Sequence, residues 1–537
     1  MTSTRVPHNH NGSVAYINGK IYTIDPSSPW ASAFIVSEDG LFTHVGTTDE
    51  IQSIAKQHYL VTVDLKGQFT MPGIHDAHMH LLFSGLGLTS EATIKMDATH
   101  LDIASKVKEG SCACEYINAY QDWVLAAAYN NQGFPDGVAD RKYLDELYPD
   151  TPVAVHGGAA HSMLLNTVAL QRAGYDIENE KDIHAGKFFR RADGSLTGEM
   201  AETAMTKAAL AIPMPDHAHV KRVLKHAIHL AHKAGVTSTQ EASSNTALLQ
   251  ALGEMEKEGS LKLDISTHIV YGCEWLGSES KDGLNQLLDT AEHFRSKHVD
   301  TRFVKIMLDG VPLAPLYTHS GLDEHGCPDH NMIVTPDVAD AVLQFDKQGK
   351  TVKIHCTGQG STRLALNAIE AARKANPRGP RHEIAHNSGV NDEDFKRYSP
   401  LNITAEMSPA ELFVHPLTSS SAGLMHWNFP AFLDAGAHIT IGSDWGAVPD
   451  PSLFSALANI VDVVGKGDRL RGGEALCKML TLNGAMAVGR EKETGSIEVG
   501  KKGNFILVDR DLSEGLFGGA RVVRTYFEGG KVWDGEV

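Results

Sequence analysis

Two hydrophobic patterns divide the chain. Near both ends, apolar and polar residues alternate in short runs, as in SVAYINGKIYTID and GNFILVDRD, which is typical of strands with one buried face. Turn-forming pairs that signal hairpins interrupt these runs at Asn18-Gly19, Asp39-Gly40 and Gly529-Gly530. Neither end is long enough for a stable sheet of its own. We therefore expect residues 1–70 and 490–537 to form one small β-sandwich together.

The middle of the chain alternates short apolar runs with helix-like segments such as VADAVLQFDKQG. This repetition predicts parallel strands joined by right-handed crossovers. The runs are FTMPGIHDAHMH, TPVAVHG, GVTSTQEA, LDISTHIVYG, TRFVKIMLDG, KTVKIHCTG, RHEIAHNSG, LNITAEMS and AHITIGSDWG. They suffice for an eight-stranded barrel. The predicted fold is α/β, a distorted TIM (β/α)8 barrel over 71–489, with a mostly helical insertion at about 89–150.

Composition narrows the classes of partner. The 537 residues carry a net charge of −18, with 42% hydrophobic and 21% charged residues, as in globular proteins. The acidic balance argues against nucleic acid or an anionic membrane as a partner, and no apolar stretch is long enough to span a bilayer. The 6 cysteines form no disulfide framework. We expect a cytoplasmic protein with a small-molecule substrate, and a homodimer is an open possibility.

Candidate chemistry lies where apolar runs end. His78 and His80 are two residues apart, so on a strand both imidazoles face the same side. Other polar residues stand at or just beyond the ends of later runs: Lys305, His355, His386 and Asp444. Barrel enzymes build their active sites at this rim. Imidazole and carboxylate ligands suit a divalent metal such as Zn²⁺.

In this order, the motifs make the chain resemble the metal-dependent amidohydrolase superfamily, specifically its amidohydrolase-3 or YtcJ-like branch, which includes N-substituted formamide deformylases. The resemblance covers nearly the whole chain. No single segment decides it; their order and the terminal sandwich do. The segments are PGIHDAHMH, HSMLLNTVAL, GSLTGEMAE, GVTSTQEA, VKIMLDG, the strand ending in His355, RHEIAHNSG, GSDWGAVPDP and GSIEVGKKGNFILVD.

The resemblance implies one or two divalent metals. His78 and His80 would hold the more buried metal, and His355 and His386 would hold the second. Lys305 would be carboxylated by CO₂, so that its carbamate bridges the two. The open alternatives are an ion-paired or snorkelling lysine at position 305 and polar residues that merely cap the strands.

The resemblance also implies a hydrolytic mechanism. A bound metal lowers the pKa of water from about 15.7 to about 7, and Asp444 would bind metal, accept the proton and pass it to the leaving nitrogen. The expected reaction is hydrolysis of a C–N amide bond, of the N-formyl or N-acyl amine type. A lactonase or esterase uses the same hydroxide. A heterocycle deaminase is disfavoured, since Gly358 stands where such enzymes tend to carry Glu. The last alternative is a barrel that binds a small molecule without catalysis, and it would require that the set of metal-binding residues be incomplete.

Substrate contacts are less well marked. The resemblance places His161 near the substrate, although a histidine that begins a helix is an equal reading, and Glu202 is a weaker candidate. Tyr317, in a long loop, and Trp445, next to Asp444, lie beside the proposed site. A second long loop spans 411–427. Such loops often form lids or pockets.

Two departures from the family pattern are visible. The branch usually has HxxGD after the fifth strand, where this chain has HCTGQ at 355–359, and an Ala-Asp pair is common where it has GNF at 503–505. No arginine lies immediately beside the candidate ligands except Arg381. This favours a neutral or apolar amide as substrate.

Overall fold

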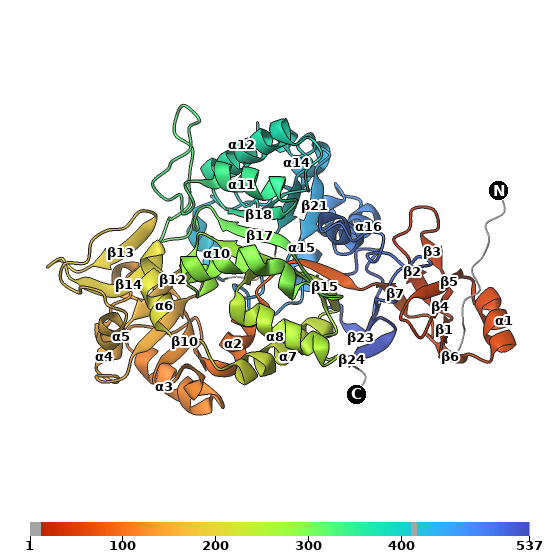
Figure 1. Cartoon of the computed structure of the whole chain (residues 1–537), viewed down its shortest axis with the longest axis horizontal. Helices are drawn as coiled ribbons and strands as arrows, with labels where there is room; N and C mark the ends of the chain where they lie inside the picture. Colours follow the sequence, from red (N-terminus) through yellow and green to blue (C-terminus); the bar gives the residue numbers. More distant parts are fainter. Residues whose placement is uncertain (1–11, 410–415, 536–537) are drawn as a thin grey trace.

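The computed structural model describes residues 12–409 and 416–535. Its centre is a sheet of eight parallel strands that curves into a nearly closed barrel (Figure 1). Neighbours along the barrel are consecutive strands, as right-handed crossovers require. The strands are β8 (Ile74–Met79), β15 (Val236–Ser244), β16 (Asp264–Tyr271), β17 (Val299–Met307), β18 (Thr351–Cys356), β19 (Glu383–His386), β20 (Thr404–Met407) and β21 (His438–Ile441). The predicted barrel fold is confirmed.

Helices connect the barrel strands and cover their outer face. The connection from β19 to β20 is an exception and contains only the short 3₁₀ helix η6 (Phe395–Arg397), which distorts the outer ring. The helices are α2 (Leu81–Ser90), α7 (His217–Lys233), α8 (Thr246–Lys257), α9 (Glu274–Gly277), α10 (Lys281–Thr290), α11 (Val338–Lys347), α12 (Gln359–Ala375), α14 (Phe429–Asp434), α15 (Phe454–Val464), α16 (Arg469–Met479) and α17 (Leu482–Ala487).

The barrel is closed at its carboxyl rim by the segment that follows β21. The backbone N–H of Asp444 donates to the carbonyl of His78 at 2.8 Å, and the N–H of His80 donates to the carbonyl of Trp445 at 2.9 Å. Asp76 Oδ1 accepts from the N–H groups of both His78 and Ser443, each at 3.0 Å. These bonds fix the first and last strands against each other where the candidate ligands stand.

A second unit contains two sheets built from both ends of the chain. One sheet has the order β5-β4-β1-β6 and the other β24-β23-β22-β7-β2-β3, so N-terminal and C-terminal strands share the second sheet. Aromatic rings fill the space between the sheets: Phe34 lies 4.9 Å from Phe505, which stacks on Tyr526 at 4.3 Å. The expected sandwich is therefore present. Its elements are β1 (Val14–Ile17), β2 (Lys20–Tyr22), β3 (Trp30–Ala31), β4 (Ala33–Val36), β5 (Phe42–Gly46), α1 (Thr48–His58), β6 (Val61–Asp64), β7 (Phe69–Pro72), β22 (Phe505–Val508), β23 (Val522–Phe527) and β24 (Gly530–Asp534).

One expected hairpin in this unit is wrong. Asp39-Gly40 and Gly529-Gly530 do lie between paired antiparallel strands, β4 with β5 and β23 with β24. Asn18-Gly19 instead joins β1 to β2, which belong to different sheets. β1 pairs with β4 and β6, while β2 pairs with β3 and β7. The positive φ of Asn18, 57°, thus turns the chain from one sheet to the other.

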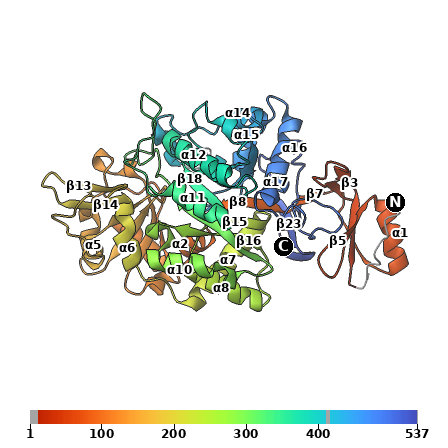
Figure 2. The same cartoon turned by 45° about the horizontal axis from the view of Figure 1, so that its top comes forward.

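The insertion between β8 and β15 is larger than residues 89–150 and contains a sheet. Its six strands have the order β13-β14-β12-β11-β10-β9, and they continue to Glu202. The insertion and the two-sheet unit lie at opposite ends of the long axis of the molecule (Figures 1 and 2). The elements are β9 (Ala92–Thr93), α3 (Ile103–Ala113), β10 (Val124–Tyr129), α4 (Lys142–Asp145), β11 (Val153–Gly157), β12 (Ser162–Leu165), α5 (Thr167–Arg172), β13 (Gly186–Arg190), β14 (Leu196–Glu202) and α6 (Thr206–Ala211).

The run TPVAVHG, expected as a barrel strand, is β11 of this insertion sheet. It pairs in parallel with β10 and antiparallel with β12. Apolar residues of the insertion form a separate cluster that includes Ala126, Val155 and Leu164, each fully buried. The run is apolar because it crosses this second core, so its composition does not distinguish it from a barrel strand. Within the described ranges, no helix is both long and apolar enough to cross a membrane.

Candidate active site

The six strand-end residues predicted as ligands converge at the carboxyl rim of the barrel. Asp444 is central: its Oδ1 lies 3.2 Å from His80 Nε2 and 3.6 Å from His78 Nε2, and its Oδ2 lies 3.8 Å from His386 Nδ1. The ring of His355 is 4.5 Å from that of His386. The Nζ atom of Lys305 lies 3.3 Å from His78 Nε2. All six side chains line one pocket.

Hydrogen bonds fix which nitrogen of each HxH imidazole faces the cluster. The Nδ1 of His78 lies 3.0 Å from the Glu406 carboxylate; when Glu406 is ionised its oxygens can only accept, and Nδ1 then carries the proton. The Nδ1 of His80 lies 2.8 Å from Ser243 Oγ, and this hydroxyl donates its own proton to Glu241. Both Nε2 atoms therefore present lone pairs toward Asp444, as metal-binding histidines do when a second group holds the other nitrogen.

His355 is held through its other ring nitrogen, Nε2, rather than through Nδ1. Its Nε2 donates to the carbonyl of Gly310 at 3.1 Å, which leaves the Nδ1 lone pair free to bind an ion. The Nδ1 of His386 lies 3.2 Å from Ser408 Oγ, which donates to Glu406. Burial lowers the pKa of His386 to about 3 and that of His355 well below its usual value. Both imidazoles are thus neutral and able to act as ligands near pH 7.

Lys305 lies near the end of β17 and is 1% exposed. Burial and the nearby Lys353 cation lower the pKa of Lys305 to about 8. An appreciable fraction of this amine is therefore uncharged at neutral pH, and an uncharged amine is the form that reacts as a nucleophile.

The backbone of the rim is strained at two of the predicted ligand positions. His386 has a φ of 72° and Asp444 a φ of 52°, in the left-handed region that residues other than glycine rarely adopt. Such conformations persist where the surroundings hold them, and they cluster at functional sites. Here Asp444 is held by its bond to the carbonyl of His78.

The donor set fits a divalent metal. The ligand atoms of His78, His80 and Asp444 lie within 4.8 Å of one another, and so do those of His78, His386 and Glu406. Neutral imidazoles and a carboxylate in a buried cluster are the ligands that Zn²⁺ and similar ions take in catalytic sites. The residues present are therefore suited to such an ion.

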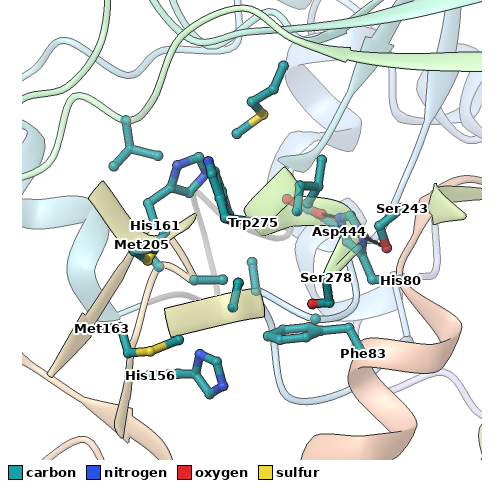
Figure 3. A pocket seen from close by; sticks show the side chains of 18 of the residues that line it. His80, Phe83, His156, His161, Met163, Met205, Ser243, Trp275, Ser278 and Asp444 are labelled. Atoms are coloured by element: carbon teal, nitrogen blue, oxygen red, sulfur yellow. Dashed lines mark hydrogen bonds and ion pairs between the residues drawn. The ribbon is translucent and has the colours of Figure 1, made fainter. Parts of the chain in front are cut away.

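The pocket beside the cluster is predominantly apolar, and one wall comes from the insertion. Figure 3 shows His161 and Met205 opposite His80 and Asp444 across this space. Among its described lining residues Lys305 is the only lysine, and none is an arginine. Arg381 does not line it. The apolar lining includes Phe83, Leu86, Leu125, Met163, Met205, Ile212, Trp275, Leu276, Val311 and Leu313.

His161 and Glu202 form a buried pair in the insertion wall. His161 Nδ1 lies 2.9 Å from Glu202 Oε1, which also accepts from the hydroxyl of Thr318 at 2.8 Å. Burial opposes protonation of His161, but the Glu202 carboxylate outweighs it and raises the pKa of the imidazole. The ring of His161 is 5.3 Å from that of His355, so it stands next to the cluster. His161 lines the pocket, whereas Glu202 lies behind it.

The other two expected substrate contacts do not line the pocket. Tyr317 is 44% exposed, and its hydroxyl lies 3.4 Å from the carbonyl of Ser420 on the outside of the loops. The side chain of Trp445 is buried, and its carbonyl accepts from His80 and Ser84. These positions give the two residues structural contacts rather than substrate contacts. In the loop 411–427, residues 411–415 lie outside the described part of the chain, while Thr418 and Met425 line the pocket.

Sequence reasoning missed the acids that support the cluster. Glu406 contacts His78 and the backbone of His386, and burial raises its pKa to about 7. Asp309 accepts hydrogen bonds from the N–H groups of Thr357 and Gly358 and so orders the loop after His355. The available signal was a carboxylate placed inside, or just beyond, an otherwise apolar strand, because such a group must be hydrogen-bonded when buried.

Comparisons with known proteins agree with this geometry. Residues 61–515 match the amidohydrolase family. The chain is 25% identical to the N-substituted formamide deformylase of Arthrobacter pascens over 547 aligned positions, which cover 96% of this chain and 97% of the relative. It is 24% identical to the putative amidohydrolase YtcJ of Bacillus subtilis, covering 73% and 72% of the two chains. A solved structure, an uncharacterized metal-dependent hydrolase from Pyrococcus horikoshii, has a TM-score of 0.69 at 19% identity, covering 94% of this chain and 99% of that one.

Proposed function

Because this chain belongs to the amidohydrolase family, it is a hydrolase of carbon–nitrogen bonds, and we propose that its substrate is an N-formyl or N-acyl amine. The observation that carries the proposal is the convergence of four histidines, Lys305 and Asp444 on one end of an apolar pocket. The similarity to a formamide deformylase over nearly the whole chain supports the same reaction class.

The ligands for the metal would be shared between two positions. His78, His80 and Asp444 would hold one divalent ion, with Zn²⁺ the best match to their chemistry. Lys305, His355 and His386 would hold a second ion if Lys305 is a carbamate. When bound, such an ion supplies a Lewis acid and a hydroxide nucleophile at neutral pH.

The carbamate would form directly on Lys305. The uncharged Nζ attacks CO₂, the new N–C bond forms as one C=O π bond opens onto oxygen, and the nitrogen loses one proton to solvent, which gives an N-carboxylate. Burial lowers the pKa of this lysine to about 8, so the reactive amine is accessible near neutral pH. The product replaces a buried cation with an anion beside neutral imidazoles, which suits a bridging ligand.

Asp444 would move the proton. Its carboxylate accepts a proton from the attacking water and then donates it to the leaving nitrogen, so that an amine rather than an amide anion departs. His161 would contact the substrate from the opposite wall, and Glu202 would hold its imidazole in position. Because Glu202 favours the protonated form of His161, this imidazole is suited to stabilise the negative charge that develops on the substrate's carbonyl oxygen.

A deaminase remains disfavoured for a steric reason. A Cβ atom at Gly358 would meet the carbonyl oxygen of Ser320 at 2.0 Å, so no acidic side chain fits at this position without movement of the loop. The acid missing from the HCTGQ segment has a neighbour of similar chemistry in Asp309, which binds the same stretch of backbone.

We expect a panel of N-formyl amines, N-acyl amino acids and lactones to identify the substrate class. N-formyl or neutral N-acyl amines should give the highest kcat/KM, because the pocket is apolar and has no arginine among its described lining residues to pair with a substrate carboxylate. Metal analysis of the same preparation should show one to two equivalents of a transition metal. Turnover of lactones alone by metal-loaded protein would contradict the proposal.

Replacement of His161 tests its contact with the substrate. We expect His161→Ala to lower kcat by about 10²–10³-fold, the usual loss when one group that stabilises an oxyanion is removed. The metal content should stay unchanged, because His161 is not a proposed ligand. His325→Ala, at an exposed loop histidine, is the matched control and should retain full activity. A wild-type kcat in His161→Ala would assign this residue a structural role.

A further inference from the structure

A second polar group of side chains lies in the same pocket, away from the histidine cluster. Glu91 follows α2, Tyr120 belongs to a 3₁₀ helix of the insertion, and His156 lies on β11. All three line the pocket. In Figure 3, His156 lies beside Met163 on the side of the pocket away from His80 and Asp444.

The Glu91 carboxyl is buried but weakly bound. Its side chain is 3% exposed, and Oε1 accepts one long hydrogen bond, 3.4 Å, from the hydroxyl of Tyr120. His156 Nε2 lies 3.9 Å from the same oxygen, beyond hydrogen-bond distance. No lysine or arginine of the described residues forms an ion pair with Glu91. A buried carboxyl without close donors is costly to keep ionised, and burial accordingly raises its pKa.

An aromatic ring connects this group to the histidine cluster. The Phe83 ring lies 5.6 Å from that of His156. Phe83 also lies near His80, because both side chains pack against Gly446. A Cβ added to Gly446 would come within 3.3 Å of an atom of each. The apolar side chain of Phe83 is therefore close to both His156 and His80.

We propose that Glu91, with Tyr120 and His156, forms a distal subsite that binds an ammonium group of the substrate. A cation supplies the charge and the N–H donors that Glu91 lacks, and the Tyr120 oxygen is a further acceptor for it. The apolar wall lined by Phe83 would accommodate an alkyl or aryl spacer. The substrate class is then an amine that is formylated or acylated at one nitrogen and carries a second, free amino group.

This inference rests on the proposed amide hydrolysis for its substrate, and its test compares matched compounds. N-formyl diaminoalkanes are compared with N-formyl alkylamines and N-formyl amino alcohols of equal chain length. We expect the wild-type enzyme to prefer the ammonium-ended series by about tenfold or more in kcat/KM, because hydrogen bonds to charged groups are the strong ones. No preference, or an equal preference for the hydroxyl-ended series, would overturn the proposal.

Variants assign the preference to Glu91. Glu91→Gln should abolish it, so that the kcat/KM ratio of the ammonium-ended to the alkyl-ended series falls to about one. Glu91→Asp keeps the charge but withdraws it by one methylene, so the preferred diamine should become longer. Glu115→Gln removes the same charge from an exposed position nearby and should change neither result. A preference that persists in Glu91→Gln would refute the subsite.

Binding separates this inference from the proposed reaction. In wild-type protein, n-alkylammonium ions should raise the melting temperature at concentrations about tenfold lower than n-alkanols of the same length, and Glu91→Gln should remove the difference. If no formamide is hydrolysed but this difference is found, amide hydrolysis fails and the ammonium subsite stands. If formamides are hydrolysed without any end-group preference, the reaction stands and the subsite fails.

Discussion

The variant Asp444→Asn should lose turnover while its metal content remains unchanged. The amide keeps the size of the side chain and one oxygen, so it can still place an oxygen where Asp444 Oδ1 lies, 3.2 Å from His80 Nε2. An amide cannot accept a proton at neutral pH, and both proposed proton transfers depend on this residue. General acid–base groups contribute about 10²–10⁴-fold, and we expect a loss of kcat at the upper end of this range.

The measurement pairs steady-state kinetics with metal analysis. Asp450→Asn, at an exposed position in the same loop, is the matched control and should behave as wild type. Circular dichroism should show that both variants are folded. Hydrolysis at the wild-type rate by metal-loaded Asp444→Asn would remove this residue from the proton relay and leave the proposed mechanism without a base.

Removal of the metal should abolish hydrolysis and also destabilise the protein. Prolonged dialysis against a chelator is expected to reduce activity to background, and Zn²⁺ should restore it. An ion that binds only the folded chain stabilises it by mass action, by about 2.7 kcal/mol at a free concentration one hundred times Kd. The melting temperature should therefore rise when Zn²⁺ is added back.

His78 provides the sharpest control for that result. In the proposed arrangement it holds one of the ions together with His80 and Asp444, so His78→Ala should reduce the stabilisation by Zn²⁺. His325→Ala, on an exposed loop, should keep it. Full activity of a protein shown to contain no metal would exclude the proposed hydrolytic mechanism altogether.

The barrel and the six clustered residues were predictable for a simple physical reason. Strands buried on both faces appear in the sequence as continuous apolar runs. A polar residue at the carboxyl end of such a run therefore lies at the rim of the barrel. His355, His386 and Asp444 each follow this pattern, and the structure brings them together. Their roles as ligands stay predictions until a metal is measured.

The errors in the predicted fold concern strand pairing, which the local sequence pattern does not determine. β11 has the composition of a barrel strand, yet it pairs with β12 inside the insertion. Asn18-Gly19 has the composition of a hairpin turn, yet it joins strands of two sheets. In both segments the local structure was read correctly, and the choice of neighbour depended on contacts distant in sequence.

The supporting acids were missed for a related reason. Glu406 lies in the apolar run LNITAEMS, where an acid is unusual. Its burial there is explained by its contact with His78 on β8, the first strand of the barrel, which is distant in sequence. Glu91 lies between a helix and a short strand, and its place in the pocket follows from the folding of the insertion over the rim. Tyr317 illustrates the opposite error, since proximity to the site in sequence did not bring it into the pocket.

The sheet shared by the two ends of the chain sets an order for biosynthesis. β7 ends at Pro72, and its antiparallel neighbour β22 begins at Phe505. At roughly 5–20 residues per second, a ribosome needs tens of seconds to make the intervening segment. During that time one edge of β7 lacks its partner, and an open edge invites pairing with other nascent chains. Pairing of β7 with β22 therefore has to wait until all eight barrel strands have been made, because β21 ends at Ile441.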